Sequence, residues 1–390
     1  MRLIFSILHE VRLFEIWLFM NLFKFLPLRK KVVFANFNGR GFGDNPKYIA
    51  NEILRQNLNW KLVWLASDNS IPFPSCIKVV KFYSIKAIFE LSTAKVIINN
   101  VKNGLPYIKR QSQYYIQTWH GSFPLKYIEK ESEDLLGKDY VSKSQRDSEI
   151  TDLLLSSCKS DTEIYKNAFW FKGEIMEKGI PRNDIYFTAK DKDKINIKNS
   201  IGIKNNQKIV MYAPTFRDDG DIDCYNLDYN LLLRSLNSKD ESWTLLIRMH
   251  PNVKDYLLPQ IHKRAIMDVS KYPDPQKLVL ISDLIITDYS SIIFDATLNR
   301  TPVILFSCDL DKYKKERGLR PIFFDLPFPY CDTMKKLIGV VEYFNAGLYW
   351  ERVDLFMKTK VQSFDDGHAS ERVVERIKEV IDGTFHKSKL

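Results

Sequence analysis

Cysteine and histidine are both scarce in this chain of 390 residues. The five cysteines are odd in number and form no Cys-x-x-Cys pair. This argues against a disulfide framework and a cysteine-based zinc site, and it favours a reducing compartment. The sequence also has no His-Glu-x-x-His run, no Walker motif, no internal repeat and no low-complexity tract. Because only six histidines are present, each one in a motif-like setting can be weighed individually.

A long uncharged apolar run is missing as well. In residues 1–28 the longest uncharged stretch near the centre is 16–23, far short of the roughly 20 residues that a membrane-spanning helix needs. Acidic residues inside the apolar region and the lack of a small-x-small cleavage site argue against a signal peptide. We therefore predict an amphipathic helix over 1–28 in the bilayer interface, followed by a basic cluster at 29–31. The alternative is a helix that packs on the protein's own core or on a partner.

The composition is that of a globular protein, with 45% hydrophobic and 27% charged residues, which excludes disorder, collagen and coiled coil. The net charge of +10 fits an acidic partner, such as nucleic acid, an anionic membrane or a phosphorylated substrate. The lysines and arginines are scattered and accompany no basic-aromatic RNA motif, so nucleic acid is not expected as a partner.

Short β-branched apolar runs alternate with segments of helical periodicity along the chain, which predicts βαβ units, parallel sheets and an α/β fold. A polar stretch rich in lysine and asparagine, 189–206, interrupts this pattern and is the best linker candidate. The length suggests two domains at roughly 150 residues each. The predicted strands are 31–37, 61–66, 77–80, 96–99, 114–118, 153–156, 209–213, 243–248, 265–269, 284–287 and 303–306. The predicted parts are a membrane-associating helix (1–28), an N-terminal domain (29–188), a C-terminal domain (189–365) and a C-terminal helix (366–390).

The segment 284–298 gives the strongest sign of a binding site. A strand leads into an Asp288-Tyr289 turn, and Ser290 or Ser291 caps the following helix. Serine hydroxyls and backbone N–H groups at a helix N-terminus after a strand suit phosphate oxygens. Asp295 falls one turn into the same helix. The alternative is that the serines only start the helix, since serine is a favoured N-cap residue.

Three other loops leave corresponding strand ends, where an open α/β sheet binds its ligands. Both histidines in these loops are followed directly by proline or glycine, so we expect them in turns, one in each predicted half. The polar residues of these loops are Thr215 and Arg217, then Arg248 and His250, and then His120 with Lys126.

Two Asp-x-Asp pairs, at 221–223 and 309–311, imitate the motif that chelates a divalent ion with a nucleotide diphosphate. A required metal is not predicted, because the basic and hydroxyl groups already offer charge compensation.

Seven short motifs follow one another between residues 39 and 318, which is most of the chain. They are GRGFGDNPKYI (39–49), QTWHGSFPLK (117–126), GIPRND (179–184), YAPTFRD (212–218), RMHP (248–251), DYSSIIFD (288–295) and DLDKYKKERG (309–318). The set resembles the CDP-glycerol glycerophosphotransferase family, which includes the primases and polymerases of teichoic acid synthesis. Phe123 is a local departure, since many members pass directly from serine or threonine to proline.

The resemblance implies a GT-B architecture, with two Rossmann-like domains facing across a cleft and the C-terminal helix crossing back to the first. It also implies transfer of an alditol phosphate from CDP-glycerol or CDP-ribitol to a hydroxyl of a membrane-linked glycan or polymer. CMP is released, no cofactor is expected, and the protein would lie peripherally on the cytoplasmic face of the membrane. The pathway would make teichoic acid or a capsular polymer. The positions matching the family's functional residues are His120, His250 and the turn with Asp288, Ser290 and Ser291.

The residue types suit this reaction. His120 is the candidate base for the attacking hydroxyl, since its pKa lies near neutrality. The leaving CMP would be stabilised by Ser290, Ser291, Arg248 and His250, with Thr215, Arg217 and Asp295 as further donor-side residues. The residues predicted on the acceptor side are Gly41, Asp44, Lys47, Lys126 and Arg182.

Two other functions stay open from the sequence. One is a GT-B glycosyltransferase that uses a nucleotide sugar in cell-surface polysaccharide synthesis. The other is a non-enzymatic basic adaptor for a membrane or nucleic acid, which the scattered charges disfavour.

Overall fold

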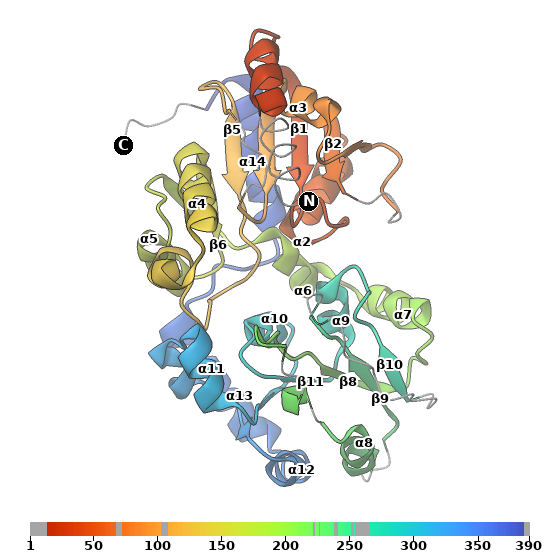
Figure 1. Ribbon diagram of the computed structural model, residues 1–390. Helices are drawn as coiled ribbons and strands as arrows, with labels where there is room; N and C mark the ends of the chain where they lie inside the picture. Colours follow the sequence, from red (N-terminus) through yellow and green to blue (C-terminus); the bar gives the residue numbers. More distant parts are fainter. Residues whose placement is uncertain are drawn as a thin grey trace, which may run out of the picture. The chain divides into compact units, whose positions relative to one another are not determined.

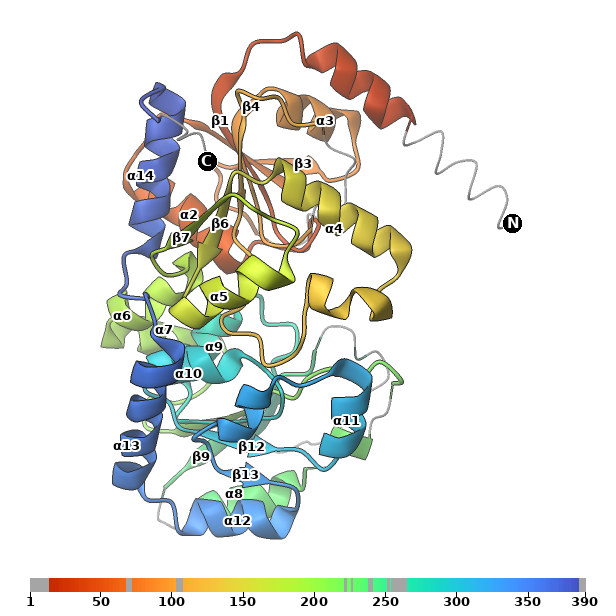
Figure 2. The same cartoon turned by 90° about the vertical axis from the view of Figure 1, so that its left-hand side faces the viewer.

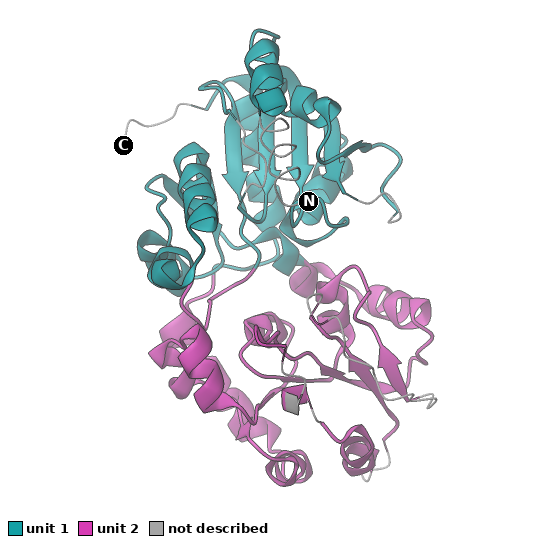
Figure 3. Ribbon diagram, viewed as in Figure 1, with its two compact units in different colours: residues 1–120, 129–184, 364–390 teal, residues 121–128, 185–363 magenta. Residues whose placement is uncertain are grey.

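The computed structural model describes residues 14–67, 72–102, 108–220, 223–225, 227–237, 241–250, 253 and 265–385. Three predicted features lie outside these residues in part: positions 1–13 of the interfacial helix, Pro251, and the first aspartate of the 221–223 pair. The chain forms two compact units (Figure 3). Unit 1 comprises residues 1–120, 129–184 and 364–390, and unit 2 comprises 121–128 and 185–363.

Unit 1 is built on a seven-stranded sheet with the order β3-β2-β1-β4-β5-β6-β7, all parallel (Figure 1). Its strands are β1 (Arg29–Ala35), β2 (Lys61–Ala66), β3 (Lys78–Lys81), β4 (Ala94–Asn99), β5 (Tyr114–Gln117), β6 (Leu153–Ser156) and β7 (Glu174–Glu177). The central strands read as continuous apolar runs because both faces of the sheet are covered. Because β1, β4 and β5 are neighbouring parallel strands, the loops that follow them lie at the same edge of the sheet.

Helices cover both faces of this sheet. They are α2 (Asp44–Arg55), α3 (Ile85–Ser92), α4 (Lys138–Ile150), α5 (Lys159–Ala168) and α14 (Ala369–Asp382), with 3₁₀ helices η1 (Glu129–Leu135) and η2 (Pro181–Asp184). The C-terminal helix α14 packs Val373, Val374 and Ile377 into the same core cluster as α2 and β1 (Figure 2). Asp184 anchors its start by accepting hydrogen bonds from the backbone N–H groups of Ala369 (2.9 Å) and Ser370 (2.7 Å).

The described part of the N-terminal segment is helical over residues 14–23. One face contributes Ile16 and Met20 to the core between α3 and the sheet. This agrees with the alternative that the helix packs on the protein's own core. The other face leaves Phe14, Trp17 and Leu22 more than half exposed. Among the described residues, no helix combines the length and the apolar character needed to cross a bilayer.

Unit 2 holds a six-stranded parallel sheet with the order β10-β9-β8-β11-β12-β13. Its strands are β8 (Lys208–Tyr212), β9 (Trp243–Ile247), β10 (Ile266–Asp268), β11 (Leu284–Thr287), β12 (Val303–Phe306) and β13 (Tyr330–Cys331). The strand order reverses between β8 and β11, and the carboxyl ends at such a reversal form the ligand crevice of doubly wound folds. The α/β fold with parallel sheets predicted from the sequence is confirmed in both units.

The helices of unit 2 are α6 (Ile185–Thr188), α7 (Asp191–Ser200), α8 (Tyr229–Asn237), α9 (Pro275–Ile281), α10 (Ile292–Leu298), α11 (Leu310–Arg317), α12 (Met334–Glu342) and α13 (Ala346–Phe356). Helix α7 occupies residues 191–200 of the stretch 189–206, which the sequence offered as a linker candidate. Asp193 caps this helix by accepting from the Lys190 backbone N–H (2.9 Å), and Ile197 is buried against unit 2. A helix that buries one apolar side chain carries almost no periodic signal.

The unit boundaries also differ from the expected ones. Unit 2 begins at 185 and not 189, unit 1 resumes at 364 and not 366, and residues 121–128 belong to unit 2. Predicted strands agree with the observed ones to within about two residues. The missed strands β7 and β13 are short, with glutamates at both ends of the first and only two residues in the second.

Candidate active site

His120 lies in the turn that follows β5, at the carboxyl edge of the unit 1 sheet. Its Nδ1 is 2.8 Å from the backbone oxygen of Asn100, which follows β4. A carbonyl oxygen only accepts hydrogen bonds, so Nδ1 carries the proton in this contact and Nε2 of the neutral ring keeps its lone pair. Asn100 is itself fixed, since its side chain accepts from the Phe37 N–H (2.8 Å) and donates to Asn36 Oδ1 (2.8 Å).

Aromatic rings enclose the imidazole, with centroids of Phe37 at 5.4 Å and Trp119 at 4.2 Å. Burial lowers the pKa of His120 below its ordinary value, and the Asn100 contact and the charge of Asp44 only partly oppose this. The ring is therefore neutral at pH 7. A neutral imidazole with one free nitrogen has the protonation state that a general base needs.

The glycine-rich loop after β1 supports this turn from within unit 1. Asp44 and Arg182 are both buried and form an ion pair of 3.1 Å. Gly41 has φ +70°, and its carbonyl accepts from Trp64 Nε1 at 3.1 Å. Lys47 is partly exposed and lies over the ring of Phe42. A side chain at Gly39 would be strained, because its Cβ would lie 2.8 Å from the backbone nitrogen of Ser67 at a φ of +96°.

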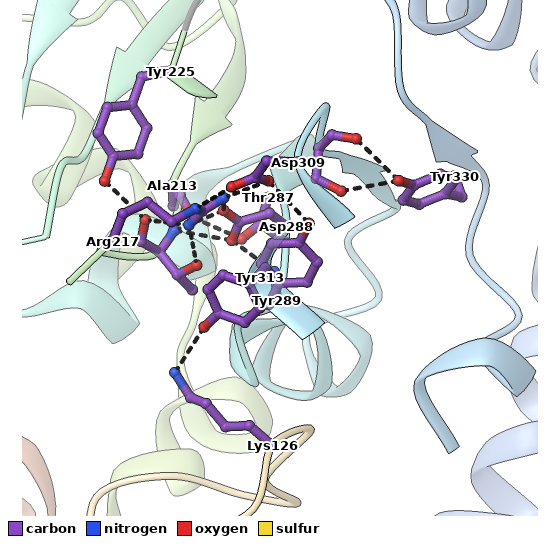
Figure 4. Close-up of polar contacts among 12 residues, drawn as sticks. Lys126, Ala213, Arg217, Tyr225, Thr287, Asp288, Tyr289, Asp309, Tyr313 and Tyr330 are labelled. Carbon is purple, nitrogen blue, oxygen red and sulfur yellow. Dashed lines mark hydrogen bonds and ion pairs between the residues drawn. The ribbon is translucent and has the colours of Figure 1, made fainter. Parts of the chain in front are cut away.

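In unit 2 the predicted Asp288 turn is bound to the loop after β8 (Figure 4). The Asp288 carboxylate accepts from the backbone N–H groups of Thr215 (2.9 Å) and Tyr289 (2.6 Å), and from Arg217 Nη2 (2.9 Å). Arg217 also forms a two-point contact with Asp309, at 2.6 and 3.1 Å. These contacts hold the loops after β8, β11 and β12 together.

Arg217 is only 2% exposed and its guanidinium lies over the rings of Tyr289 (5.1 Å) and Tyr313 (4.8 Å). Burial alone would lower the pKa of Arg217, but hydrogen bonding to Asp309 and the charge of Asp288 raise it above its ordinary value. The guanidinium thus stays charged and is held by protein groups. Its predicted role as a direct phosphate contact gives way to a supporting one in our interpretation.

The two serines flank the start of α10. Ser291 is the N-cap residue, but its side chain makes no capping hydrogen bond, whereas Ser290 Oγ accepts from the Ile292 N–H at 3.3 Å. Both serines are partly exposed, and Asp295 is buried one turn later. Gly121 approaches them closely, since a Cβ on it would lie 3.2 Å from Ser291 Oγ. The serine hydroxyls are therefore placed where a ligand of unit 2 can reach them.

Arg248 and His250 follow β9 in the same unit. Arg248 donates to the backbone oxygens of Val269 (3.0 Å) and Tyr272 (2.9 Å), and burial lowers its pKa to about 10. It remains a cation at neutral pH. His250 is exposed, with its ring stacked on Phe216 at 5.7 Å.

The segment directly after His120 packs on unit 2. Phe123, which has φ +35° and is buried, lies against Phe294 of α10 at 5.0 Å. Lys126 pairs with Leu319 in an antiparallel bridge, and its Nζ donates to Tyr313 Oη at 3.2 Å. Lys126, which the sequence placed on the acceptor side, thus belongs to unit 2 and contacts Tyr313 of α11.

Asp309 of the second Asp-x-Asp pair is a partner of Arg217. Within the described ranges, no group of three or more histidine, cysteine or acidic side chains could hold a metal ion. Sequence reasoning missed Asn100 and Tyr289 as supporting residues. Only their positions directly after β4 and β11, at the edge where the sites form, could have indicated them.

Each unit is a doubly wound α/β sheet with polar residues in the loops at its carboxyl edge, an arrangement typical of enzymes that bind nucleotides. The sequence profile of the CDP-Glycerol:Poly(glycerophosphate) glycerophosphotransferase family matches residues 16–379. The chain belongs to this family, which confirms the family and the enzyme class predicted from the seven motifs.

The chain is 33% identical over 377 residues to the teichoic acid glycerol-phosphate transferase of Staphylococcus aureus, covering 90% of this chain and 94% of that protein. It is 31% identical over 371 residues to the teichoic acid poly(glycerol phosphate) polymerase of Staphylococcus epidermidis, covering 89% of this chain and 50% of that one. It therefore spans about half the length of that polymerase. Among solved structures, a variant of the wall teichoic acid polymerase TagF soaked with CDPG is similar, with a TM-score of 0.86 and 29% identity, covering 99% and 97% of the two chains.

Proposed function

We propose that this protein transfers glycerol phosphate, or ribitol phosphate, from a CDP-alditol to a hydroxyl of a membrane-linked glycan or polymer in teichoic acid or capsular polymer synthesis. The observation that carries the proposal is the 2.8 Å contact between Nδ1 of His120 and the backbone oxygen of Asn100, which leaves the lone pair on Nε2. The proposal includes the GT-B pairing of the two units that the family resemblance implies.

In this reaction Nε2 of His120 takes the proton of the acceptor hydroxyl, and the acceptor oxygen forms a bond to the phosphorus that bears the alditol. The bond from that phosphorus to the bridging oxygen breaks, and CMP leaves with the electron pair. Ser290, Ser291, His250 and the Arg248 cation are proposed to stabilise the charge on the leaving phosphate. No step needs a cofactor.

The remaining residues are proposed to act indirectly or on the acceptor. Thr215 and Asp288 shape the turn at 288–291, the proposed donor side, through the hydrogen bond from the Thr215 N–H to the Asp288 carboxylate. Asp295 supports this turn from α10. Gly41 and Lys47 stay proposed for the acceptor side, because their loop lies at the same sheet edge as His120.

Nucleotide release separates this function from the glycosyltransferase alternative. With CDP-glycerol, CDP-ribitol and UDP-sugars offered in parallel to a lipid-linked acceptor, we expect CMP to be released and the alditol phosphate to appear on the acceptor. Release of UDP with glycosyl transfer would contradict the proposal. The number of units added per acceptor would distinguish priming from polymerisation.

We further propose that the N-terminal helix attaches the protein to the cytoplasmic face of the membrane. Phe14, Trp17, Leu18 and Leu22 are exposed on the helix, opposite the face that packs on the core, and Phe25 is exposed in the turn that follows it. Of the basic cluster at 29–31, Arg29 and Lys30 are exposed, while Lys31 is buried in an ion pair with Glu90. Exposed aromatic residues beside two exposed basic residues suit the interface of an anionic bilayer.

The variant Trp17→Ala/Phe25→Ala is expected to bind vesicles containing phosphatidylglycerol about tenfold more weakly in a flotation assay, because two interfacial aromatic rings are lost. Substitution is a sharper test than deletion of residues 1–28, since Ile16 and Met20 belong to the core. Tyr343→Ala removes an aromatic ring that is 84% exposed on unit 2 and serves as the matched control. Equal vesicle binding by all three proteins would contradict the anchor.

A further inference from the structure

The ion pair between Asp44 and Arg182 holds the backbone of the His120 turn. Arg182 Nη1 donates to Asp44 Oδ2 at 3.1 Å and also to the backbone oxygen of His120 at 3.0 Å. Next to it, Asn45 Oδ1 accepts from the Arg182 N–H at 2.9 Å, and Asn45 Nδ2 donates to the Trp119 oxygen at 3.1 Å. Two consecutive carbonyl groups of the turn are thereby held by groups from α2 and η2.

These side chains are poorly placed to bind a substrate directly. Asp44 is 5% exposed and Arg182 is 6% exposed, and both have protein partners. A buried ion pair is also a weak source of stability, because apolar residues of similar volume often serve equally well. The presence of charges at this position therefore calls for a role other than folding or direct binding.

The backbone around the pair is strained. Asp44 has φ +53° and Trp119 has φ +54°, the left-handed region that residues other than glycine rarely adopt. Such conformations persist where the surrounding contacts enforce them, and they concentrate at functional sites. Here the enforcing contacts are the hydrogen bonds from Arg182 and Asn45.

The pair also places two opposite charges beside the imidazole. The charge of Asp44 raises the pKa of His120 and that of Arg182 lowers it, against the larger lowering caused by burial. Glu129 of η1 acts in the same sense as Asp44. The other charged groups on this side are Lys102, 5.7 Å from the Trp119 ring, and its partner Asp147 of α4.

We propose that Asp44 and Arg182 are positioning residues, which hold the His120 turn by its backbone and place a pair of opposite charges beside the imidazole, and do not bind the acceptor. The inference rests on the proposed function only in taking His120 as the base. It reassigns two residues that the sequence placed on the acceptor side.

The effect of the two charges on the pKa of His120 is tested in the full-length protein without substrate, by following the His120 ring signals in NMR pH titrations. Asp44→Asn keeps the shape and the contact to Arg182 but removes the negative charge, so the pKa of His120 should fall. Arg182→Gln removes the positive charge, so the pKa should rise. The pKa of His120 in the double variant should lie between the values of the two single variants.

Asp382→Asn is the matched control. It changes the same residue type at the far end of α14, where Asp382 pairs with Lys30 at the start of β1, the sheet edge opposite to His120. No shift is expected. Shifts of the same sign in Asp44→Asn and Arg182→Gln, or no shift in either, would overturn the proposal.

The role of these residues in holding the backbone of the His120 turn is tested by the kinetics of CMP release. Arg182→Gln and the double variant should lower kcat by about 10- to 100-fold, because a misplaced base costs rate, with the KM for the acceptor within about twofold. Asp44→Asn keeps the contact to Arg182 and should lower kcat less. Arg182→Lys keeps the positive charge but loses the rigid set of N–H donors of the guanidinium, so it should retain the wild-type pKa of His120 with a reduced kcat. A raised acceptor KM with an unchanged kcat would restore the acceptor-binding role and overturn ours.

Folding and the proposed function are separated from this inference by two measurements. Thermal unfolding identifies any variant whose loss of activity is a loss of structure, and the titrations of variants that fold decide the inference. If the wild-type protein released no CMP from CDP-glycerol or CDP-ribitol, the proposed function would fail, and if His120→Asn kept full activity, only the role of His120 as the base would fail. The NMR titrations would still support or reject the positioning of His120.

Discussion

His120→Asn is expected to lower kcat for CMP release by about 10²- to 10⁴-fold, the range that a general base contributes. Asparagine can retain a contact with the Asn100 carbonyl, so the loss should come from the missing lone pair of Nε2 and not from unfolding. The measurement is initial-rate CMP release from CDP-glycerol at saturating acceptor. His368→Asn, at an exposed histidine that precedes α14, is the control and should leave kcat unchanged.

The pH profile should identify the same group. Because burial lowers the pKa of His120 below its ordinary value of 6.5, the neutral base persists at pH 6.5 and is lost as the pH falls through the lowered pKa. The acid limb of kcat/KM should therefore lie below pH 6.5. An acid limb at pH 7 or above, or a His120→Asn variant with the wild-type rate, would show that another group is the base.

Arg217→Met is expected to destabilise unit 2 by about 3–5 kcal/mol, the usual consequence of leaving a buried carboxylate without its partner. Asp288 is 2% exposed and loses its guanidinium, while Asp309 loses both of its contacts to the same group. For a unit of this size we expect the unfolding temperature to fall by about 10 °C. Scanning calorimetry can follow the unfolding of the two units.

Arg317→Met is the matched control, because Arg317 also pairs with an aspartate, Asp218, but on the surface. It should change stability by less than about 1 kcal/mol. The two roles considered for Arg217 give different results. If Arg217→Met left the unfolding temperature unchanged and raised only the KM for CDP-glycerol, Arg217 would be a donor ligand, as the sequence suggested.

Arg217 and Arg182 show what a sequence leaves undecided. Both occur in motifs of a phosphotransferase family, and the sequence placed Arg217 on the donor side and Arg182 on the acceptor side. The fold surrounds Arg217 with two carboxylates and two aromatic rings, and Arg182 with Asp44 and a backbone carbonyl. Which partner an arginine takes depends on chain segments that are far apart in the sequence, and motif spacing does not encode that.

The N-terminal segment shows a similar limit. Its composition indicated an amphipathic helix, and residues 14–23 are helical. The sequence could not decide which apolar residues face the core. Ile16 and Met20 pack on the sheet while Trp17 and Leu22 are exposed, because α3 and β4 provide a surface for one stripe only.

The sequence by itself determined the α/β class through the alternation of apolar runs, and the family through seven motifs in order. Because histidine is scarce, it also singled out the two histidines that lie in motifs. These features are local, since strand runs, turn residues and motifs each occupy a short stretch of chain. The tertiary structure decided which nitrogen of His120 is free, which arginines are buried and where residues 121–128 pack. Each of these depends on a hydrogen bond or ring contact between distant segments, so only the folded chain could decide it.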